Sequence, residues 1–237
     1  DVVVAVDKEA PHRIRIRGRV HEVSFYGPNL EIWTEISTLP GSSAFRIRDV
    51  LTNNGTYDEE FQIIYHANFG RPLLGKGAKL LAASEKIVPF NANAAKAIAQ
   101  QALYAAPTKG FTEEVYKIYP KADNDGNATA VLVNADADRG VTVRWPLAQL
   151  PYLTQWKNTA AETTGYVTGI EPGTGFPHNR SYERKYGRVP KLGAGESRTF
   201  ELEFAILANA GEVKAAAAAV KELQGDKVPE VQKAPEE

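Results

Sequence analysis

Apolar and polar residues alternate along most of this chain, which predicts a fold built from β-strands. In residues 12–20 the side chains of Ile14, Ile16 and Val20 lie on one face of such a strand, and four arginines lie on the other. We expect the apolar face to be buried and the arginine face to be solvated. The same two-residue period recurs at residues 30–36, 45–47, 61–66, 113–119, 130–133, 141–145 and 200–206.

Turn-forming sequences between these stretches indicate that the strands pair in antiparallel fashion. Asn53-Asn54-Gly55 and Asp138-Arg139-Gly140 supply the positive φ angles or Asx turns that hairpins use. Residues 91–104 are rich in Ala and fit either a short surface helix or a loop over the sheet.

The last part of the chain no longer shows the alternation that predicts strands. Residues 212–223 are mostly Ala, Lys and Glu and stand before Gly225, so they predict a helix. After Gly225 the chain is rich in Pro, Glu and Lys, a composition typical of disorder. We therefore divide the chain into a β-sandwich domain at 1–209, a C-terminal helix at 210–224 and a disordered polar tail at 225–237.

Composition and charge exclude several classes of partner. The 237 residues fit one large domain, and 28 Lys and Arg against 29 Asp and Glu leave a net charge of -1. This balance gives no basic field for nucleic acid or anionic lipid, and no apolar run approaches the roughly 20 residues that cross a bilayer. We expect no nucleic acid or membrane partner. We also expect a soluble protein, with the cytoplasm favoured although the sequence leaves the compartment open.

The cysteines and histidines that usually bind metals and cofactors are absent or unsuitably spaced in this sequence. There is no Cys, which excludes thiolate metal sites, disulfides and a Cys nucleophile. None of the four histidines stands at metal-ligand spacing from another. We therefore expect neither a metal nor a cofactor.

Two segments place polar side chains at the ends of strands. His66 and Asn68 share one face just before Gly70 and Pro72 end the strand. They fit either a ligand site or simple hydrogen bonds to loop backbone.

The second segment ends in a carboxylate. Gly169 and Glu171 share a face at the start of a Gly- and Pro-rich loop that also carries His178 and Arg180. Burial there would raise the pKa of Glu171 towards that of a general base, and the loop could close over a ligand. The alternative is a glutamate that accepts hydrogen bonds from the loop's own amides.

Between these segments lie two adjacent carboxylates and a tryptophan. Neighbouring residues on a strand point to opposite faces, so only one of Glu113 and Glu114 can enter a pocket shared with His66. Trp156 follows a Pro-containing loop and fits either an aromatic wall for a sugar or a core or rim tryptophan.

These motifs carry a family resemblance. His66-Ala67-Asn68-Phe69 resembles the His-Pro-Tyr-Phe strand of aldose 1-epimerases, the galactose mutarotase family, and Gly169-Ile170-Glu171-Pro172 resembles the strand that holds their catalytic glutamate. Glu113-Glu114-Val115-Tyr116, and Leu150-Pro151 with Trp156, stand between them in the family's order. The resemblance covers roughly residues 13–207 and is closest to an aldose 1-epimerase-like subgroup of unassigned substrate.

The resemblance implies a large antiparallel β-sandwich, the galactose mutarotase-like supersandwich, with a sugar-binding cleft on one sheet. It implies an isomerase that opens and recloses the ring of a monosaccharide or sugar derivative. Glu171 would be the base at the anomeric hydroxyl and His66 the acid at the ring oxygen, too far apart for a direct hydrogen bond. The remaining sugar contacts would be Glu113, Asn68, Trp156, His178 and Arg180. The alternative is a non-catalytic carbohydrate-binding or regulatory protein on the same sandwich.

The sequence also departs from the family. Asn68 stands where mutarotases have Tyr, and no counterpart of the family's earlier arginine and second histidine precedes His66. A start at Asp1 without any Met predicts a processed or trimmed N-terminus. Three alternatives stay open: the arginine and the second histidine lie in a missing N-terminal part, come from a partner chain, or are absent in function. If N-terminal strands are missing, we expect an uncovered sheet edge that a missing N-terminal segment or self-association completes.

Overall fold

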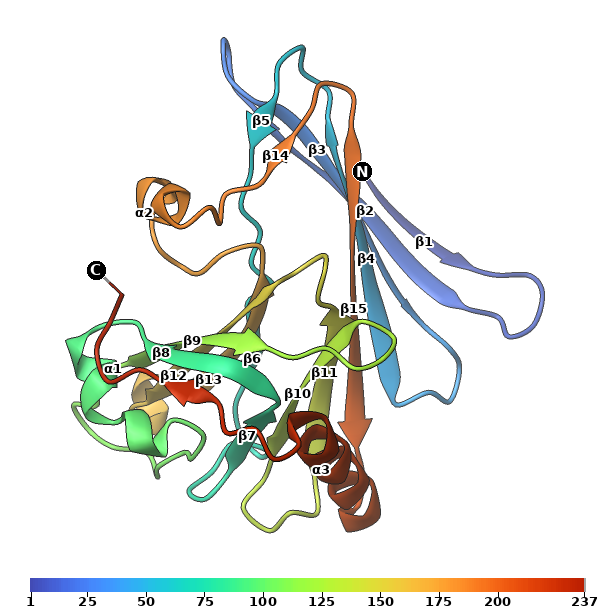
Figure 1. The fold of residues 1–237 in the computed structure, drawn as a ribbon. Coiled ribbons are helices and arrows are strands. Elements are labelled where there is room, and N and C mark those ends of the chain that lie inside the picture. The colour runs from blue at the N-terminus through green and yellow to red at the C-terminus, as the bar shows by residue number, and fades with distance from the viewer. Residues whose placement is uncertain (237) are drawn as a thin grey trace.

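The protein is a sandwich of two large β-sheets (Figure 1). The structure is a computed structural model that describes residues 1–236. Neighbouring strands of both sheets are antiparallel, apart from the short β16, which runs parallel to β8. The first sheet has eight strands in the order β1 (Val2–Val6), β2 (Ile14–Val23), β3 (Asn29–Thr38), β4 (Ala44–Asn53), β15 (Ser197–Leu207), β11 (Gly140–Pro146), β10 (Asn127–Val133) and β7 (Lys79–Ala82).

The second sheet carries most of the polar residues that the sequence singled out. It has six strands in the order β16 (Glu230–Val231), β8 (Ser84–Pro89), β9 (Glu114–Pro120), β12 (Tyr152–Thr159), β13 (Tyr166–Gly173) and β6 (Ala67–Phe69). A small ladder joins β5 (Glu59–Glu60) to β14 (Lys191–Leu192). The antiparallel β-sandwich that we expected is confirmed.

Short helices connect the strands, and one longer helix follows β15. The Ala-rich stretch forms a helix rather than a loop, with α1 (Ala92–Lys96) followed by a 3₁₀ turn, η1 (Ile98–Gln100). A second 3₁₀ turn, η2 (Glu162–Thr164), precedes β13, and α2 (Arg180–Lys185) follows it. The expected C-terminal helix is α3 (Ala210–Gln224), which packs Val213 against Val131 and Val133 of β10. No helix among residues 1–236 is long and apolar enough to span a bilayer.

The core lies between the two sheets, because apolar and polar side chains alternate along most strands and the apolar ones point inward. Phe200 and Leu202 of β15 face Leu153 and Ile170 of the second sheet in one buried cluster. Trp145 of β11 is 1% exposed, and its indole nitrogen donates a hydrogen bond of 2.9 Å to the Leu150 carbonyl. The outer face of the six-stranded sheet is therefore left for polar side chains.

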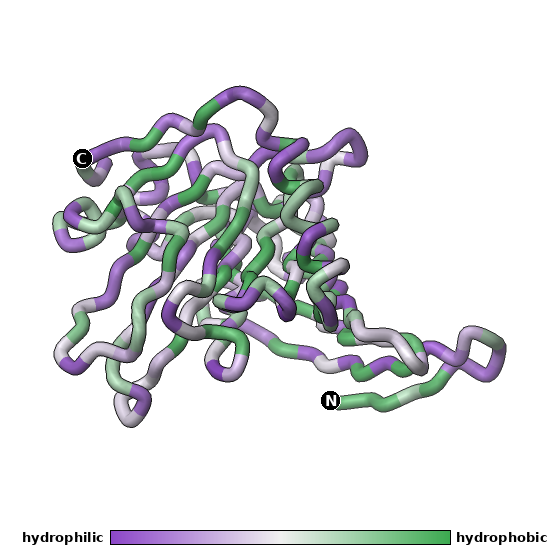
Figure 2. Tube along the Cα trace, turned by 90° about the horizontal axis from the view of Figure 1, so that it is seen from below, coloured by the Kyte–Doolittle hydropathy of each residue, from purple (hydrophilic) through white to green (hydrophobic). Residues whose placement is uncertain are grey.

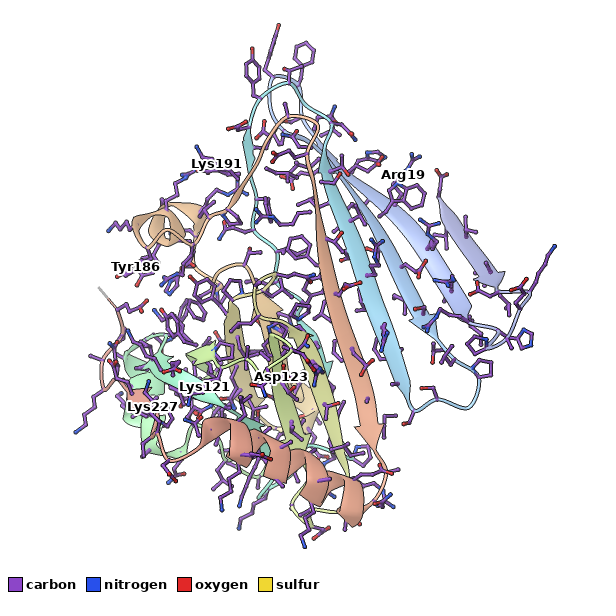
Figure 3. The ribbon with its side chains drawn as sticks, turned by 45° about the vertical axis from the view of Figure 1, so that its right-hand side comes forward. Arg19, Lys121, Asp123, Tyr186, Lys191 and Lys227 are labelled. Atoms are coloured by element: carbon purple, nitrogen blue, oxygen red, sulfur yellow. The ribbon has the colours of Figure 1, made fainter. Side chains whose placement is uncertain are left out.

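Strands β1 to β3 project from the body of the sandwich (Figures 1 and 2). Their arginine face is exposed to a varying degree, with Arg17 and Arg19 exposed as expected and Arg13 and Arg15 half-buried; Arg19 is labelled on the projecting strands in Figure 3. The expectation of a buried apolar face is wrong, because Ile14, Ile16 and Val20 are 38%, 45% and 63% exposed. The second sheet does not extend beneath these strands, so an alternating pattern shows which residues share a face but not whether that face is covered. All five residues of β1 are exposed, and β1 forms an uncovered edge.

Residues 225–236 also differ from the disordered tail that their composition suggested. Val231 pairs with Ile87 of β8, and the Gln232 amide donates a hydrogen bond of 2.9 Å to the Ile87 carbonyl. The Glu236 side chain is only 10% exposed and is bonded to Lys117 of β9. A few specific polar contacts hold this segment, and a composition poor in apolar residues does not reveal them.

Candidate active site

Glu171 lies on the outer face of the six-stranded sheet. Ile170 is buried in the core, so its neighbours Gly169 and Glu171 point to the opposite face of β13. The Glu171 carboxylate folds back over Gly169, where a Cβ atom would lie 2.2 Å from Glu171 Oε1. Only glycine leaves this space for the carboxylate. Glu171 is 3% exposed, and burial raises its pKa to about 7.

His66 lies directly beside this carboxylate. Strand β6 pairs with β13 so that Ala67 is opposite Ile170, which places His66 next to Glu171. His66 Nε2 is 3.0 Å from Glu171 Oε1, but the ring nitrogen is not aligned for a hydrogen bond, and this buried oxygen has no hydrogen-bond partner among the described residues. The expectation that the two groups are too far apart for a direct hydrogen bond is wrong in its distance, because these two atoms lie within hydrogen-bond reach of each other. The cause is the pairing of β6 with β13, which makes them cross-strand neighbours.

Trp156 and Glu113 extend this pair into a chain of contacts. Trp156 is opposite Gly169 in the ladder, and its ring centre lies 5.5 Å from that of His66 at an interplanar angle of 63°. The indole nitrogen donates a hydrogen bond of 2.7 Å to Glu113 Oε2. Glu114 points to the other face of the sheet, where its carboxylate lies 3.2 Å from Lys157 Nζ. As the strand alternation requires, one of the two adjacent carboxylates reaches the His66 side.

Asn68 lies at the edge of the same group. It is exposed, it is opposite Gly169 in the ladder, and it follows His66 by two residues, so it shares the face that carries Glu171. The register therefore brings Asn68 together with the four residues in contact.

His178 packs over the same sheet farther along. Its ring is stacked between Phe90 and Tyr182, at centre distances of 4.0 Å and 3.9 Å. Burial, together with the positive charge of Lys117, lowers the pKa of His178 to about 4, so the imidazole is neutral at neutral pH. Its Nε2 atom is buried without a hydrogen-bond partner among residues 1–236.

Arg180 is not brought into this group. Its Nε donates a hydrogen bond of 3.3 Å to Gln62 Oε1, and both residues line a hollow beside Leu30 and Ile32 of β3. The arginine is exposed at the start of α2 and faces the eight-stranded sheet.

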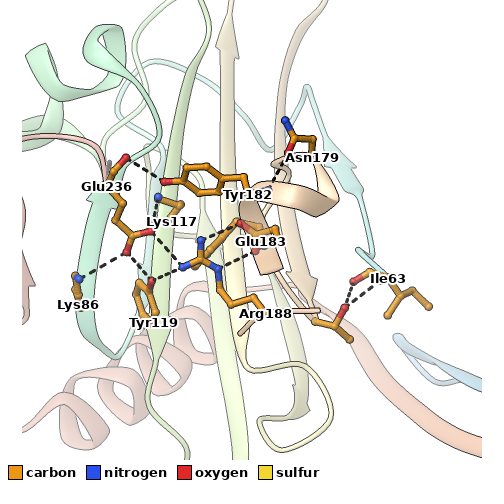
Figure 4. Close-up of polar contacts among 11 residues, drawn as sticks. Ile63, Lys86, Lys117, Tyr119, Asn179, Tyr182, Glu183, Arg188 and Glu236 are labelled. Carbon is orange, nitrogen blue, oxygen red and sulfur yellow. Dashed lines mark hydrogen bonds and ion pairs between the residues drawn. The ribbon is translucent and has the colours of Figure 1, made fainter. Parts of the chain in front are cut away.

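A cluster of buried charges on the same face was not predicted (Figure 4). Lys117 of β9 is fully buried, and its Nζ lies 2.7 Å from Glu236 Oε2. Arg188 forms a bidentate ion pair with Glu183, in which Nε and Nη2 donate hydrogen bonds of 2.8 Å and 2.9 Å to the two carboxylate oxygens. Arg188 Nη1 also donates a hydrogen bond of 3.2 Å to Glu236 Oε2. The Tyr119 hydroxyl donates a hydrogen bond of 2.9 Å to Glu236 Oε1.

The pKa values in this cluster follow from its contacts. Burial lowers the pKa of Lys117, because the charged form is desolvated. Burial alone would raise the pKa of Glu236, but hydrogen bonds from Lys117 and Tyr119 outweigh it and lower the pKa to about 2. A lysine in the middle of the apolar stretch 115–119 is the one sequence signal that could have indicated this cluster.

The arrangement can support acid–base chemistry at a sugar. A carboxyl group that titrates near neutral pH stands beside an imidazole and an aromatic wall, which suits proton transfer to and from hydroxyl and ring oxygens. Within residues 1–236 no group of three or more His, Cys, Asp or Glu side chains is placed to bind a metal.

Comparison with known proteins decides the family. Residues 1–206 match the profile of a domain of unknown function, DUF4432. The chain belongs to the DUF4432 family. A comparison of this DUF4432 chain with curated proteins found no match.

Solved structures confirm the resemblance to galactose mutarotase-like proteins. A protein of Klebsiella pneumoniae subsp. pneumoniae MGH 78578, described as a candidate aldose 1-epimerase, is 41% identical with a TM-score of 0.96, over 99% of this chain and 61% of that one. A galactose mutarotase-like protein from Clostridium acetobutylicum is 13% identical with a TM-score of 0.58, over 86% of this chain and 66% of that one. The DUF4432 chain thus spans less than two thirds of either protein. At such low identity the second match shows the fold alone.

Proposed function

We propose that this DUF4432 protein is an aldose 1-epimerase-like isomerase that interconverts the anomers of a monosaccharide or sugar derivative. The observation that carries the proposal is the contact between a buried glutamate with a pKa of about 7 and a histidine that directly precedes the neighbouring strand β6. The similarity to the Klebsiella protein, described as a candidate aldose 1-epimerase, supports the same reaction class.

The chemistry requires one base and one acid at neighbouring oxygens. Glu171 takes the proton of the anomeric hydroxyl, the electrons of that O–H bond form the carbonyl, and the bond between the anomeric carbon and the ring oxygen breaks. His66 donates a proton to the ring oxygen. After rotation about the next C–C bond the steps reverse on the other face of the carbonyl, which restores both groups.

The direct contact of the two side chains suits this reaction. The anomeric oxygen and the ring oxygen are bonded to the same carbon, so an acid and a base that serve them must also be neighbours. The distance of 3.0 Å between His66 Nε2 and Glu171 Oε1 meets that requirement. Glu171 Oε1 has no hydrogen-bond partner within residues 1–236, so it can accept the hydroxyl proton.

Three other residues serve the sugar in this proposal. Trp156 forms a wall beside His66, and the Glu113 carboxylate that holds the indole is exposed and can accept a sugar hydroxyl. Asn68 is exposed on the same face and supplies both a donor and an acceptor.

The proposal is tested with freshly dissolved α-anomers of glucose and galactose, followed by optical rotation or anomeric NMR signals. We expect the protein to accelerate equilibration. The substitution Glu171→Gln should lower turnover by roughly 10² to 10⁴ while sugar binding persists, because Gln keeps the shape but not the basicity. Glu201→Gln is the control, since this carboxylate is 52% exposed on the other sheet.

Two results would contradict the proposal. Turnover that survives Glu171→Gln would show that this carboxylate is not the base. Saturable sugar binding without any acceleration would instead favour the non-catalytic carbohydrate-binding protein.

A further inference from the structure

The carboxylate of Glu236 is held in a site that is built for an anion. It accepts hydrogen bonds from Lys117 Nζ at 2.7 Å, from the Tyr119 hydroxyl at 2.9 Å and from Arg188 Nη1 at 3.2 Å (Figure 4). Lys117 and Arg188 are 0% and 3% exposed, so both donors are fixed and nearly free of water. Charge-assisted bonds of this kind are the strong class of hydrogen bond.

The charges around Glu236 do not balance without it. Arg188 is neutralised by its two bonds to Glu183, which is also buried. Lys117 has Glu236 as its ion-pair partner, and Lys86 Nζ lies 3.7 Å from Glu236 Oε1. If Glu236 withdrew, Lys117 would be a buried cation without a counter-ion, which is unfavourable in a protein interior. Another anion would therefore be drawn to this place.

This cluster shares a face of the sheet with the Glu171–His66 pair. Glu171 is opposite Thr154 on β12, and Thr154 is opposite Lys117 on β9, so the three side chains form one row across neighbouring strands. Adjacent strands lie about 4.8 Å apart, which puts Lys117 about 10 Å from Glu171 along the row. A single monosaccharide with a charged substituent can span such a distance.

Two unpartnered polar atoms lie near this row. Thr154 is 1% exposed, and its hydroxyl has no hydrogen-bond partner within the described residues. The buried Nε2 of His178, a residue whose pKa responds to the charge of Lys117, is also unpartnered. Buried polar groups are nearly always hydrogen-bonded, so two such groups beside one row indicate a ligand that bonds to them.

We propose that Lys117, Arg188 and Tyr119 form a substrate subsite for an anionic group, and that Glu236 fills this subsite until the substrate displaces it. The substrate class is then a monosaccharide that carries a carboxylate or a phosphate at the end opposite its anomeric carbon. This inference rests on the proposed function, because that function places the anomeric carbon at Glu171. The tail and the substrate compete for the same donors.

Apart from the Glu236 carboxylate, a small number of contacts holds the tail. These contacts are the two-residue ladder of β16 with β8, the Gln232 amide bond to the Ile87 carbonyl, an ion pair of 2.9 Å between Lys227 Nζ and Glu85 Oε2, a hydrogen bond from Gln224 Nε2 to the Lys227 carbonyl, and the Glu236 carbonyl, which accepts a hydrogen bond of 3.0 Å from the Tyr182 hydroxyl. Replacing Glu236 by Gln removes the charge that pairs with Lys117 and leaves the rest of the segment in place.

The test measures sugar binding by calorimetry with the whole chain and its Glu236→Gln variant. The probes are glucuronate and galacturonate for the carboxylate, glucose 6-phosphate and galactose 6-phosphate for the phosphate, and glucose and galactose as neutral sugars. We expect Glu236→Gln to bind at least one anionic sugar tenfold or more tightly than the parent protein, with no change for the neutral sugars. Glu230→Gln is the matched control, because Glu230 lies on the same tail and is exposed.

The donors are tested in the Glu236→Gln background. Lys117→Met should abolish the gain in affinity for anionic sugars. If Lys117→Met fails to fold, Lys86→Met is used instead, because Lys86 is partly exposed, and it should reduce this gain. Failure of Glu236→Gln to tighten the binding of any of the four anionic sugars would overturn the subsite, as would a gain that both lysine variants leave intact.

Anomerisation assays on the same proteins separate this inference from the proposed function. Acceleration for neutral sugars, with no gain for anionic sugars in Glu236→Gln, would reject the subsite and keep the isomerase. Tighter binding of anionic sugars without anomerisation of any probe would keep the subsite and reject the isomerase.

Discussion

The protonation state of Glu171 should set the pH dependence of the reaction. A base must be deprotonated to act, and burial holds the pKa of Glu171 at about 7 instead of the ordinary 4.5. We therefore expect kcat/KM to fall about tenfold for each pH unit below the pKa of Glu171. The measurement is the rate of anomer equilibration at a series of pH values, after subtraction of the spontaneous rate. An apparent pKa near 4.5 for the fall in rate at acidic pH would contradict the assignment of Glu171 as the base.

Gly169 offers a way to move the base without replacing it. In Gly169→Ala the new Cβ would lie 2.2 Å from Glu171 Oε1, so the carboxylate would have to move away from residue 169 and out of its present position beside His66. Displacing a catalytic group by about 1 Å can cost 10²-fold, and we expect a loss of turnover of that order with little change in thermal unfolding. Gly75→Ala is the control, since a Cβ there meets nothing within 4 Å. Full turnover in Gly169→Ala would show that the carboxylate position is not critical.

At the scale of single residues, sequence reasoning singled out Glu171 and His66, which the structure brings together, but not the anion cluster. Glu171 and His66 stand in recognisable motifs next to glycines and prolines. Arg188 and Glu236 have no such context, because their roles come from contacts across 48 residues of chain. A pattern within one strand cannot report a partner that lies so far along the sequence.

At the scale of elements, the alternation of apolar and polar residues identified the strands but not which strands pair with one another. The sequence predicts His66 and Glu171 at two separate strand ends, and nothing in either segment indicates that β6 pairs with β13. Register depends on the whole sheet, since a strand can bury its apolar face against several partners. The expectation that His66 and Glu171 are too far apart for a direct hydrogen bond is wrong in its distance for this reason.

The start of α3 gives a prediction about stability. The Asn209 side chain accepts a hydrogen bond of 3.0 Å from the Glu212 amide, and Glu212 Oε2 accepts one of 2.6 Å from the Ala208 amide. Asn209→Ala removes the cap and should lower the free energy of unfolding by about 1 kcal/mol, measured by urea denaturation. Lys214→Ala, at an exposed position of the same helix, should leave it nearly unchanged. Equal midpoints for the two variants would mean that the cap contributes nothing to α3.

At the scale of the whole molecule, the projecting strands expose an apolar face. Ile16 and Ile36 are opposite each other in the ladder, are 45% and 40% exposed, and lie near Val4 at the uncovered edge. Exposed apolar patches on a sheet favour association. We expect the mass measured by analytical ultracentrifugation to rise with concentration, and Ile16→Glu with Ile36→Glu to suppress this rise.

The control for this experiment lies on the other face of the same strand. Arg17→Gln changes a solvated residue and should leave association unaltered. A single mass at all concentrations, with no effect of the double substitution, would rule out self-association through this face.

The position of Trp156 gives the site its own optical reporter. The chain has three tryptophans: Trp145 is sealed in the core at 1% exposure, Trp33 lies on the eight-stranded sheet near Arg17 and Arg19, and Trp156 touches the His66 ring. Indole emission shifts when a nearby charge changes or water is displaced. In a Trp33→Phe background, the arrival of a sugar beside His66 could therefore be followed by intrinsic fluorescence in real time, without a label.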